Sequence, residues 1–423
     1  MCAQLPYFEL DGNVKSSKEP IMKKIISPIL MCILVTQFAF AQNFTRNPRD
    51  TLIKANNSNI EYVGRWYPDN DNMDSSWGNS IEVEVSNTAF ISVVLQPDFS
   101  NATIDYEYRL YPKNTTPPAK ATYLHLTADQ LSQPIELILA STKDITLDQN
   151  TTYILKFHRR SEALFGFTIF KGFLASTNAQ THKITDKSPI KFEFIGDSIT
   201  AGFKVDNPSG QSSREIQYEN ANDAYGPLLA KKFGSDQWSM VAKSGIGIDE
   251  IQGSDVPMLA RYPYKYFSWN PYPQDAKWDF SKSQPNIIIL FLGTNDVVFN
   301  AYNPSNFKSK YEALLNMIHD NNTKAKIFCI TPLYTTTPYH LPVWDAITTD
   351  IHQAVNESDP NHSYIFAIDP GTELDPWLTP KNAAQGGDYA GDMTHPNKMG
   401  HKLLAQNLYK IIKANPGVEN LLR

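Results

Sequence analysis

The chain has 423 residues, enough for two or three domains at roughly 100 to 200 residues each. Hydrophobic residues make up 41% of it and charged residues 19%, which excludes an acidic disordered chain and a coiled coil. The net charge is −6 and the sequence has no lysine- and arginine-rich stripe that could follow a phosphate backbone, so nucleic acid is not expected as a partner.

Residues 1–41 have the layout of a leader that contains a secretory signal. Met22-Lys23-Lys24 precedes an apolar run from Ile25 to Phe40, which ends in Ala39-Phe40-Ala41. This order of basic, apolar and small residues predicts cleavage after Ala41, with either Met1 or Met22 as the start. A membrane anchor is the alternative, but the run is shorter than the roughly 20 residues of a spanning helix. We therefore expect a secreted or periplasmic bacterial protein without integral membrane association.

The cysteines agree with a fold that needs no disulfide. Two of the three, Cys2 and Cys32, lie in the predicted leader, and only Cys329 lies beyond it. No intrachain disulfide is therefore expected in the mature chain, and the fold must be stabilised by its own core.

The segment from about Ile60 to Leu174 is typical of an all-β domain. Stretches such as 81–85 and 103–108 alternate between apolar and polar residues with a period of two, and helical periodicity is scarce. Turn-forming clusters interrupt the runs at 69–72, 112–118 and 148–150. We predict a β-sandwich or jelly roll over residues 42–180.

A polar stretch, 176–188, is predicted to be a linker or crossing segment, and a second domain is predicted over 181–423. Here strands alternate with helices, and the apolar run 285–292 is typical of a parallel strand buried on both faces. The other predicted strands are 190–195, 240–242, 326–330 and 364–368, and the predicted helices are 225–233, 306–320, 343–358 and 398–413. This order predicts an α/β domain of three layers around a parallel sheet.

Four short motifs carry groups suited to acyl transfer, mostly at the ends of predicted strands. In Gly196-Asp197-Ser198 a serine lies in a sharp strand-to-helix turn, and the glycine of Ser244-Gly245 lets a backbone N–H approach a bound oxygen. Gly293-Thr294-Asn295 offers a side-chain amide, and Asp392 precedes His395 by three residues. Each motif alone has a simpler interpretation as a turn or a helix cap. Together they supply a nucleophile, oxyanion donors, a base and a group that orients the base.

These four motifs resemble the blocks of the SGNH hydrolase superfamily, also called GDSL-type esterases, at Ser198, Gly245, Asn295 and His395. The second block reads Lys243-Ser244-Gly245 and lacks the Asn that often precedes its Gly. In the predicted β domain, three stretches resemble carbohydrate esterase family 2, which joins a jelly roll to an SGNH domain with a flavodoxin-like sheet. The three stretches are Gly64-Arg65-Trp66, Trp77 to Ser80, and Phe157 to Glu162.

The resemblance implies an acetylesterase, an acetyl xylan esterase by type, that acts on plant cell-wall polysaccharide such as acetylated xylan or glucomannan. It implies Ser198 as the nucleophile, His395 as the base and Asp392 as the residue that orients His395. The oxyanion hole is then formed by the N–H groups of Ser198 and Gly245 with the amide of Asn295, and no metal or other cofactor is required. Two alternatives stay open: an esterase for bacterial wall or exopolysaccharide acetyl groups or short-chain lipid esters, and a non-catalytic carbohydrate-binding protein. The oligomeric state is also open.

Aromatic residues between the motifs are candidates for sugar binding, because flat rings stack on sugar faces. The stretch 262–269 and Trp278 lie between the second and third blocks, and Trp269 is the substrate-binding candidate there. Trp344 and Trp377 lie between the third and fourth blocks. Packing within the protein is the alternative for all of them.

Other polar residues are assigned structural roles. Asp197 is expected to orient neighbouring amides, and Asp296 to cap the turn after it. Four histidines, His125, His158, His319 and His401, are expected at the surface or in packing, because they lack the spacing of a zinc site.

Overall fold

The computed structural model describes residues 50–421 with short gaps. The gaps are 76–79, 98–102, 119, 128–134, 141–146, 186, 208–215, 252–255, 266–276, 334–340 and 372–374. The predicted leader and Trp269 therefore lie outside the described residues. All described residues belong to one compact unit of the chain.

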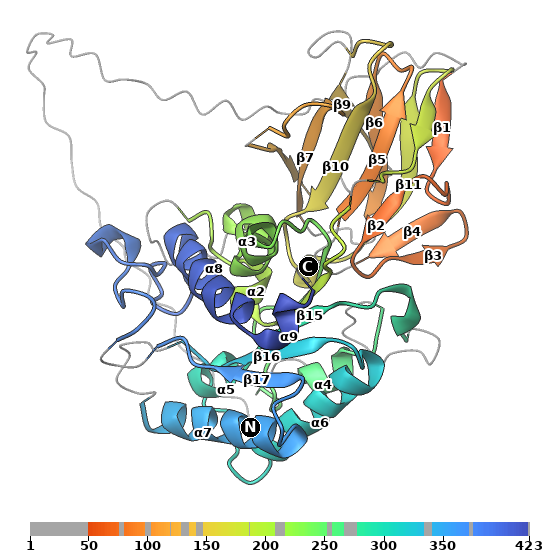
Figure 1. The fold of residues 1–423 in the computed structure, drawn as a ribbon. Coiled ribbons are helices and arrows are strands. Elements are labelled where there is room, and N and C mark those ends of the chain that lie inside the picture. The colour runs from red at the N-terminus through yellow and green to blue at the C-terminus, as the bar shows by residue number, and fades with distance from the viewer. Residues whose placement is uncertain are drawn as a thin grey trace, which may run out of the picture. The chain divides into compact units, whose positions relative to one another are not determined.

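Two antiparallel sheets form the first part of this unit, as the alternating sequence predicts (Figure 1). The first has the order β3 (Tyr67–Asp69), β4 (Asn72–Ser75), β11 (Thr168–Ala175), β6 (Ile91–Pro97) and β9 (Ile135–Ala140), with β1 (Thr51–Lys54) also on β11. The second has the order β12 (Gln180–His182), β5 (Ser80–Ser86), β10 (Tyr153–Arg159), β7 (Ile104–Pro112) and β8 (Thr122–Leu126), with β2 (Glu61–Val63) also on β5.

The sandwich core lies between the two sheets and is built from alternate residues of their strands. Val83 and Val85 of β5, for example, are fully buried together with Phe170 and Phe173 of β11. One detail corrects the sequence prediction: the stretch 176–188 is not only a linker, because β12 lies within it and pairs with β5. The composition of this stretch gives no sign of a strand, because its pairing is supplied by a partner almost a hundred residues earlier.

A five-stranded parallel sheet forms the second part, and it confirms the predicted α/β class. Its strands are β13 (Phe192–Gly196), β14 (Trp238–Ala242), β15 (Ile287–Phe291), β16 (Lys326–Ile330) and β17 (Ile365–Ile368). Their order in the sheet is β14-β13-β15-β16-β17, so the chain reverses direction across the sheet between β13 and β15. In sheets of this kind, ligands bind beyond the carboxyl ends of the strands at this switch point.

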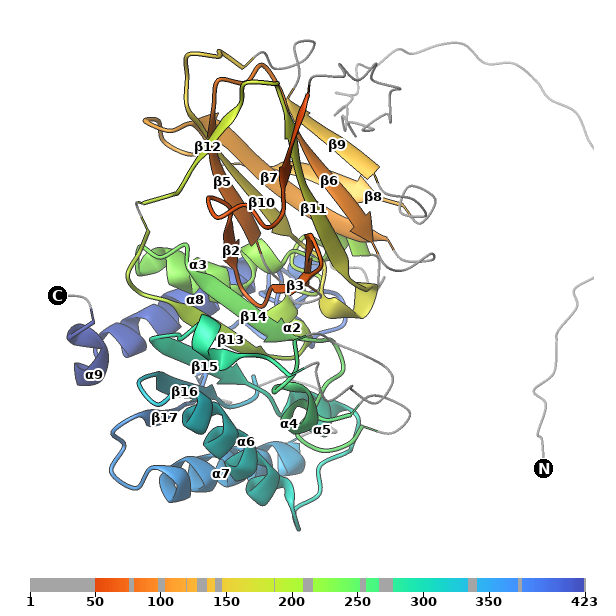
Figure 2. The ribbon, with the colours of Figure 1, turned by 90° about the vertical axis from the view of Figure 1, so that its right-hand side faces the viewer.

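Helices cover both faces of the parallel sheet, which gives the three predicted layers (Figure 2). On one face α6 (Phe307–Asn321) and α7 (Leu341–Ser358) pack on the sheet, and on the other α3 (Tyr225–Lys232) and α8 (Lys398–Lys413) do so. The shorter helices are α2 (Ser198–Ala201), α4 (Met258–Arg261), α5 (Thr294–Val298) and α9 (Pro416–Glu419). No helix in the described part of the chain is long and apolar enough to cross a membrane.

A buried arginine joins the sandwich to the α/β part. Arg65, after β2, is 1% exposed and donates hydrogen bonds to the carbonyl oxygens of Tyr262 and Tyr264. Its guanidinium lies 3.4 Å from Glu193 of β13 and 4.6 Å from the centre of the Tyr262 ring. Glu193 also accepts a hydrogen bond from the Tyr262 hydroxyl. A buried charge with this many partners fixes how the two parts pack.

Replacing Arg65 by Ala is expected to lower the free energy of unfolding by about 3 to 5 kcal/mol, because Glu193 is left as a buried charge without its partner. Urea-induced unfolding followed by circular dichroism measures this loss. Lys54→Ala is the matched control: that side chain and its partner Asp71 are 57% and 65% exposed, so their pair is worth about 1 kcal/mol or less. Equal effects of the two substitutions would contradict the role given to Arg65.

Candidate active site

The serine of the first motif lies at the carboxyl end of β13, where the sheet order reverses. Asp197 caps α2 by accepting the N–H of Ile199, and Ser198 is the first residue of that helix. Gly196 is required here, because a Cβ would lie 2.0 Å from Oγ1 of Thr200. Since Gly196 is in register with Ala242 of β14 and Phe291 of β15, the loops that follow all three strands meet at this edge.

The structure brings the serine, histidine and aspartate together from distant parts of the chain. Nε2 of His395 lies 2.7 Å from Oγ of Ser198, and its Nδ1 lies 2.8 Å from Oδ2 of Asp392. The edge of the His395 ring packs against Phe203, with 4.7 Å between the ring centres. These contacts have the geometry of a Ser-His-Asp triad, in which each side chain is oriented by the next.

Asp392 is held by more partners than the sequence suggests. Its Oδ1 accepts the N–H groups of Thr394 and His395, while its Oδ2 lies 2.6 Å from Nζ of Lys204. Burial alone would raise the pKa of Asp392, but the hydrogen bonds from His395 and Lys204 hold it well below its ordinary value. The carboxylate is therefore ionised throughout the neutral range.

Lys204 is a residue of the site that sequence reasoning missed. Its side chain is 3% exposed, and its backbone has a φ of 62°, in the left-handed region that non-glycine residues seldom adopt. The only sequence signal is its place in the turn after α2, six residues past Ser198. Its contact with Asp392 spans 188 residues and could not be read from either motif.

Two backbone N–H groups are placed to bind an oxyanion. Those of Ser198 and Gly245 have no hydrogen-bond partner among the described residues. Gly245 has a φ of 80°, which favours glycine, and the space in which a side chain would lie is open. The glycine of the second block is therefore explained by its backbone, although the Asn that often precedes it is absent.

Asn295 lies beside this loop, but its amide is already in use. Nδ2 donates to the carbonyl of Ile246 at 2.8 Å and lies 3.4 Å from Oδ2 of Asp197. As an oxyanion donor, Asn295 must share or release the weaker contact with Asp197. In this structure it connects the first, second and third motifs to one another.

Asp296 differs from its expected role as a local cap. Its carboxylate accepts the N–H groups of Ile248 and Asp249, which belong to the loop after β14. Burial raises the pKa of Asp296 to about 6 and that of Asp197 to about 7. Both carboxyl groups therefore support the loops around Ser198, and among the described residues neither forms a hydrogen bond with the Ser198 hydroxyl.

The aromatic candidates for sugar binding separate into two groups. Tyr262 is fully buried and Trp278 is 7% exposed, so both pack inside the protein. Trp344 and Trp377 are partly buried against the core cluster that α3 and α8 cover. A role of these two in substrate binding stays a prediction.

Two of the histidines assigned to packing are buried, His401 completely and His158 to all but 9%. His158 stacks on Trp238, and Nδ1 of His401 accepts the N–H of Tyr225. Burial lowers the pKa of each of these two histidines to about 3. Of the other two, His125 lies 2.7 Å from Asp105 and His319 stacks on Tyr364. The described residues contain no group of three metal-ligating side chains.

The buried histidines make the fold sensitive to acid. The unfolded chain takes up protons at these positions below pH of about 6.5, whereas the folded chain resists until about pH 3, so stability falls as the pH drops between these values. At pH 5 each histidine is expected to cost about 2 kcal/mol. His401→Asn keeps an acceptor for Tyr225 and should flatten the fall of the melting temperature from pH 7 to pH 5. The exposed His182→Asn should keep the wild-type slope, and a wild-type slope in His401→Asn would contradict the assignment.

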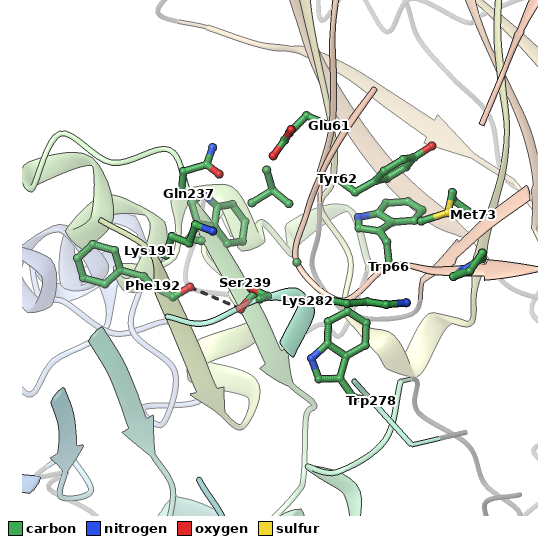
Figure 3. A pocket seen from close by; sticks show the side chains of 15 residues that line it. Glu61, Tyr62, Trp66, Met73, Lys191, Phe192, Gln237, Ser239, Trp278 and Lys282 are labelled. Carbon is green, nitrogen blue, oxygen red and sulfur yellow. Dashed lines mark hydrogen bonds between the residues drawn. The ribbon is translucent and has the colours of Figure 1, made fainter. Parts of the chain in front are cut away.

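A separate cavity lies at the other end of the parallel sheet (Figure 3). It has a volume of about 250 Å³ and is bounded by Tyr62 and Trp66 of the sandwich side and by Phe192 and Ser239 at the starts of β13 and β14. The triad follows the opposite ends of the strands, and none of its members lines this cavity.

Residues 194–403 match the model of the GDSL-like lipase/acylhydrolase family. The α/β part of the chain belongs to this family. The match extends from β13 through the Asp392–His395 motif, so it includes all four motifs.

Curated relatives and a solved structure extend the likeness to the sandwich. The chain is 28% identical over 264 residues to the cellulase/esterase CelE of Acetivibrio thermocellus, covering 61% of this chain and 30% of that one. It is 28% identical over 172 residues to an acetylxylan esterase/glucomannan deacetylase of Cellvibrio japonicus, covering 37% and 46%. It thus spans less than half the length of each relative. A family two carbohydrate esterase from Clostridium thermocellum, solved with cellohexaose, shares the fold with a TM-score of 0.66, 24% identity and coverage of 84% and 98%.

Proposed function

We propose that this protein is a secreted serine esterase that removes O-acetyl groups from plant cell-wall polysaccharide, with acetylated xylan or glucomannan as the substrate. The observation that carries the proposal is the chain of contacts from Ser198 through His395 to Asp392, at 2.7 and 2.8 Å. The curated relatives support the reaction class, since one is named an esterase and another an acetylxylan esterase/glucomannan deacetylase. The cellohexaose bound in the structural relative supports a carbohydrate substrate.

The first half of the reaction acylates the serine. Nε2 of His395 takes the proton of Ser198 as Oγ attacks the acetyl carbonyl, and Asp392 stabilises the imidazolium that forms. The carbonyl oxygen becomes an oxyanion and is bound by the N–H groups of Ser198 and Gly245 and by the amide of Asn295. The intermediate collapses as the bond to the sugar oxygen breaks, and His395 returns its proton to that oxygen.

The second half regenerates the enzyme. A water molecule gives a proton to His395 and attacks the acetyl group on Ser198. The second oxyanion occupies the same N–H groups, and its collapse releases acetate while the proton returns to Ser198. Asp392, held by Lys204, keeps the imidazole in one orientation through both halves.

Acetate release from acetylated xylan and acetylated glucomannan tests the proposal. We expect residues 42–423 to release acetate from at least one of them and to leave the deacetylated glycans intact. If acetate is released only from acetylated bacterial exopolysaccharide, or if only short-chain lipid esters are hydrolysed, that ester replaces plant polysaccharide as the proposed substrate. Glycan binding without turnover of any ester would favour a binding protein and contradict the proposal.

The Asn295→Ala substitution is expected to lower kcat by about 100- to 1000-fold with residual activity, because an oxyanion donor and the support of Ile246 are lost together. Steady-state kinetics on p-nitrophenyl acetate measures the effect. The melting temperature separates it from unfolding. Wild-type turnover in the variant would remove Asn295 from the site.

Secretion is proposed from the sequence of residues 22–41, which has basic, apolar and small-residue parts in the order of a signal peptide. An extracellular location also suits a polymeric plant substrate. Expression of the full chain in a bacterial host, followed by N-terminal sequencing of exported protein, should find a mature chain that begins at Gln42. A chain retained with its leader in the cytoplasm would contradict this.

A further inference from the structure

A segment of the sandwich reaches the catalytic loops of the α/β domain. It follows β10 and includes the short helix η1 (Ala163–Phe165). Ala163 is 2% exposed and belongs to the same core cluster as Ile195 and Ile246. The carbonyl of Arg160 accepts the N–H of Ala221 at 3.0 Å. The end of β10 is thus built into the second domain near the motif that contains Gly245.

Within this segment, the carboxylate of Glu162 holds the oxyanion loop. Its Oε2 accepts the N–H of Ser244, the residue directly before Gly245. Glu162 is 3% exposed, so this charge-assisted hydrogen bond is shielded from water. The peptide that leads into Gly245 is therefore fixed by a residue 82 positions away in another domain.

A second buried carboxyl group lies against the first. Glu219, between η2 (Ile216–Tyr218) and η3 (Ala221–Asp223), is 0% exposed, and its Oε2 accepts the N–H of Glu162 at 3.1 Å. Oε1 of each glutamate is buried without a partner among the described residues. One proton held between the two carboxyl groups satisfies both oxygens, whereas two ionised carboxylates repel each other.

The charges around the pair decide which group keeps the proton. Two cations attract the pair: Lys243 interacts with Glu162, and Arg159 interacts with both glutamates. Two anions repel it: Asp105 repels a charge on Glu219, and Asp197 repels a charge on Glu162. The Arg160 guanidinium donates hydrogen bonds to the backbone carbonyl of Glu219 and to the carboxylate of Asp206. Burial, and then the charge of Glu162, raise the pKa of Glu219 well above its ordinary value. Because the N–H of Ser244 donates to Glu162 and favours the negative charge there, the shared proton is assigned to Glu219.

We infer that Glu162 of the sandwich is a positioning residue for the proposed esterase: as a carboxylate that shares a proton with Glu219, it fixes the Ser244–Gly245 peptide so that the Gly245 N–H faces the oxyanion. The inference rests on the proposed function. It gives the sandwich a part in catalysis that does not depend on sugar binding, because one of the two backbone donors of the oxyanion hole is held from outside the α/β domain.

Kinetics of three variants on p-nitrophenyl acetate test the inference. Glu162→Ala is expected to lower kcat by about 100-fold with little change in KM, since a displaced donor weakens transition-state binding more than substrate binding. Glu162→Gln should recover most of kcat, because its amide oxygen accepts from Ser244 and its NH₂ donates to Glu219. Glu136→Ala on the exposed face of β9 is the matched control. A wild-type kcat in Glu162→Ala, or a Gln variant as poor as the Ala variant, would overturn the inference.

The Glu219→Gln variant tests the shared proton. Glutamine imitates the protonated carboxyl group, so its kcat should persist to higher pH than that of the wild type. Its stability relative to the wild type should also rise with pH above about 4.5, because only the wild-type folded state must keep an extra proton there. Identical pH profiles and identical stability would overturn this part.

One measurement separates this inference from the proposed function. Hydrogen exchange of the peptide that contains Ser244 should quicken in Glu162→Ala and stay slow in Glu162→Gln, whether or not a substrate is known. If the wild type hydrolyses esters but hydrogen exchange of the Ser244 peptide is unchanged in Glu162→Ala, the inference is overturned and the proposed esterase function is kept. If exchange is faster in Glu162→Ala but the folded wild type hydrolyses no ester, the proposed function is wrong. Glu162 would then position the loop without a role in catalysis.

Discussion

The Ser198→Ala variant is expected to lose ester hydrolysis by about 10⁶-fold in kcat, the largest effect of any single change in this protein. In the proposed mechanism the hydroxyl oxygen forms the acetyl-enzyme, and no other hydroxyl lies within hydrogen-bonding distance of Nε2 of His395 among the described residues. Because Ser198 is 5% exposed and a methyl group fits where the hydroxyl was, the fold and glycan binding should survive. Burst kinetics and acetate release from acetylated xylan measure the loss.

Ser309→Ala is the matched control for this substitution. Ser309 is exposed on the first turn of α6 and bonds only to the carbonyl of Asn306, so its loss should leave kcat unchanged. Turnover above about 1% of wild type in Ser198→Ala would show that another group attacks the ester.

The Asp392→Asn variant is expected to lower kcat by about 10⁴-fold while the fold is kept. An amide in this position can donate to Nδ1 of His395, which leaves the proton on Nε2 and prevents that nitrogen from accepting the proton of Ser198. Lys204 lies on the same Oδ2 as His395, so an amide NH₂ at that position also removes this contact of the lysine, and Lys204→Met measured alone separates the two losses. Steady-state kinetics with a titration of the variant by a serine-directed phosphonate measures it.

The stability of this variant has a defined dependence on pH. Hydrogen bonds from His395 and Lys204 overcome the effect of burial and hold the pKa of Asp392 below its unfolded value of about 3.9, so the carboxylate stabilises the wild type above that pH. The stability difference between wild type and Asp392→Asn should therefore shrink as the pH falls below about 4. Asp279→Asn, at an exposed helix cap, serves as the control for kcat. Equal turnover of Asp392→Asn and wild type would leave a Ser-His pair as the working site.

Much of the fold could be predicted from local patterns. The apolar run at 285–292 is buried on both faces as β15, because only a central parallel strand hides every side chain. The predicted helix 398–413 has the bounds of α8, since Asn397 supplies a cap at its start and apolar residues recur at helical spacing. Strand β12 was missed, because three polar residues carry no pattern and are held only by their pairing with β5.

The members of the site could be named from the sequence, because each one follows a strand or precedes a helix in a short motif. Ser198, Gly245 and Asn295 come after three neighbouring strands, and parallel strands place such residues at one edge. His395 and Asp392 are three residues apart, so their contact is local. The sequence thus determined which side chains are the candidates for the chemistry and in which kind of domain they lie.

Only the tertiary structure decided what holds those side chains in place. Three hydrogen bonds that support the site join residues 48 to 188 positions apart. They link Lys204 to Asp392, Asp296 to Ile248, and Glu162 to Ser244. A lysine or a glutamate in a turn is usually a solvated surface charge, and nothing local distinguishes these. They become supports of the site because folding buries them, and a buried charge is stable only where the fold brings it a partner.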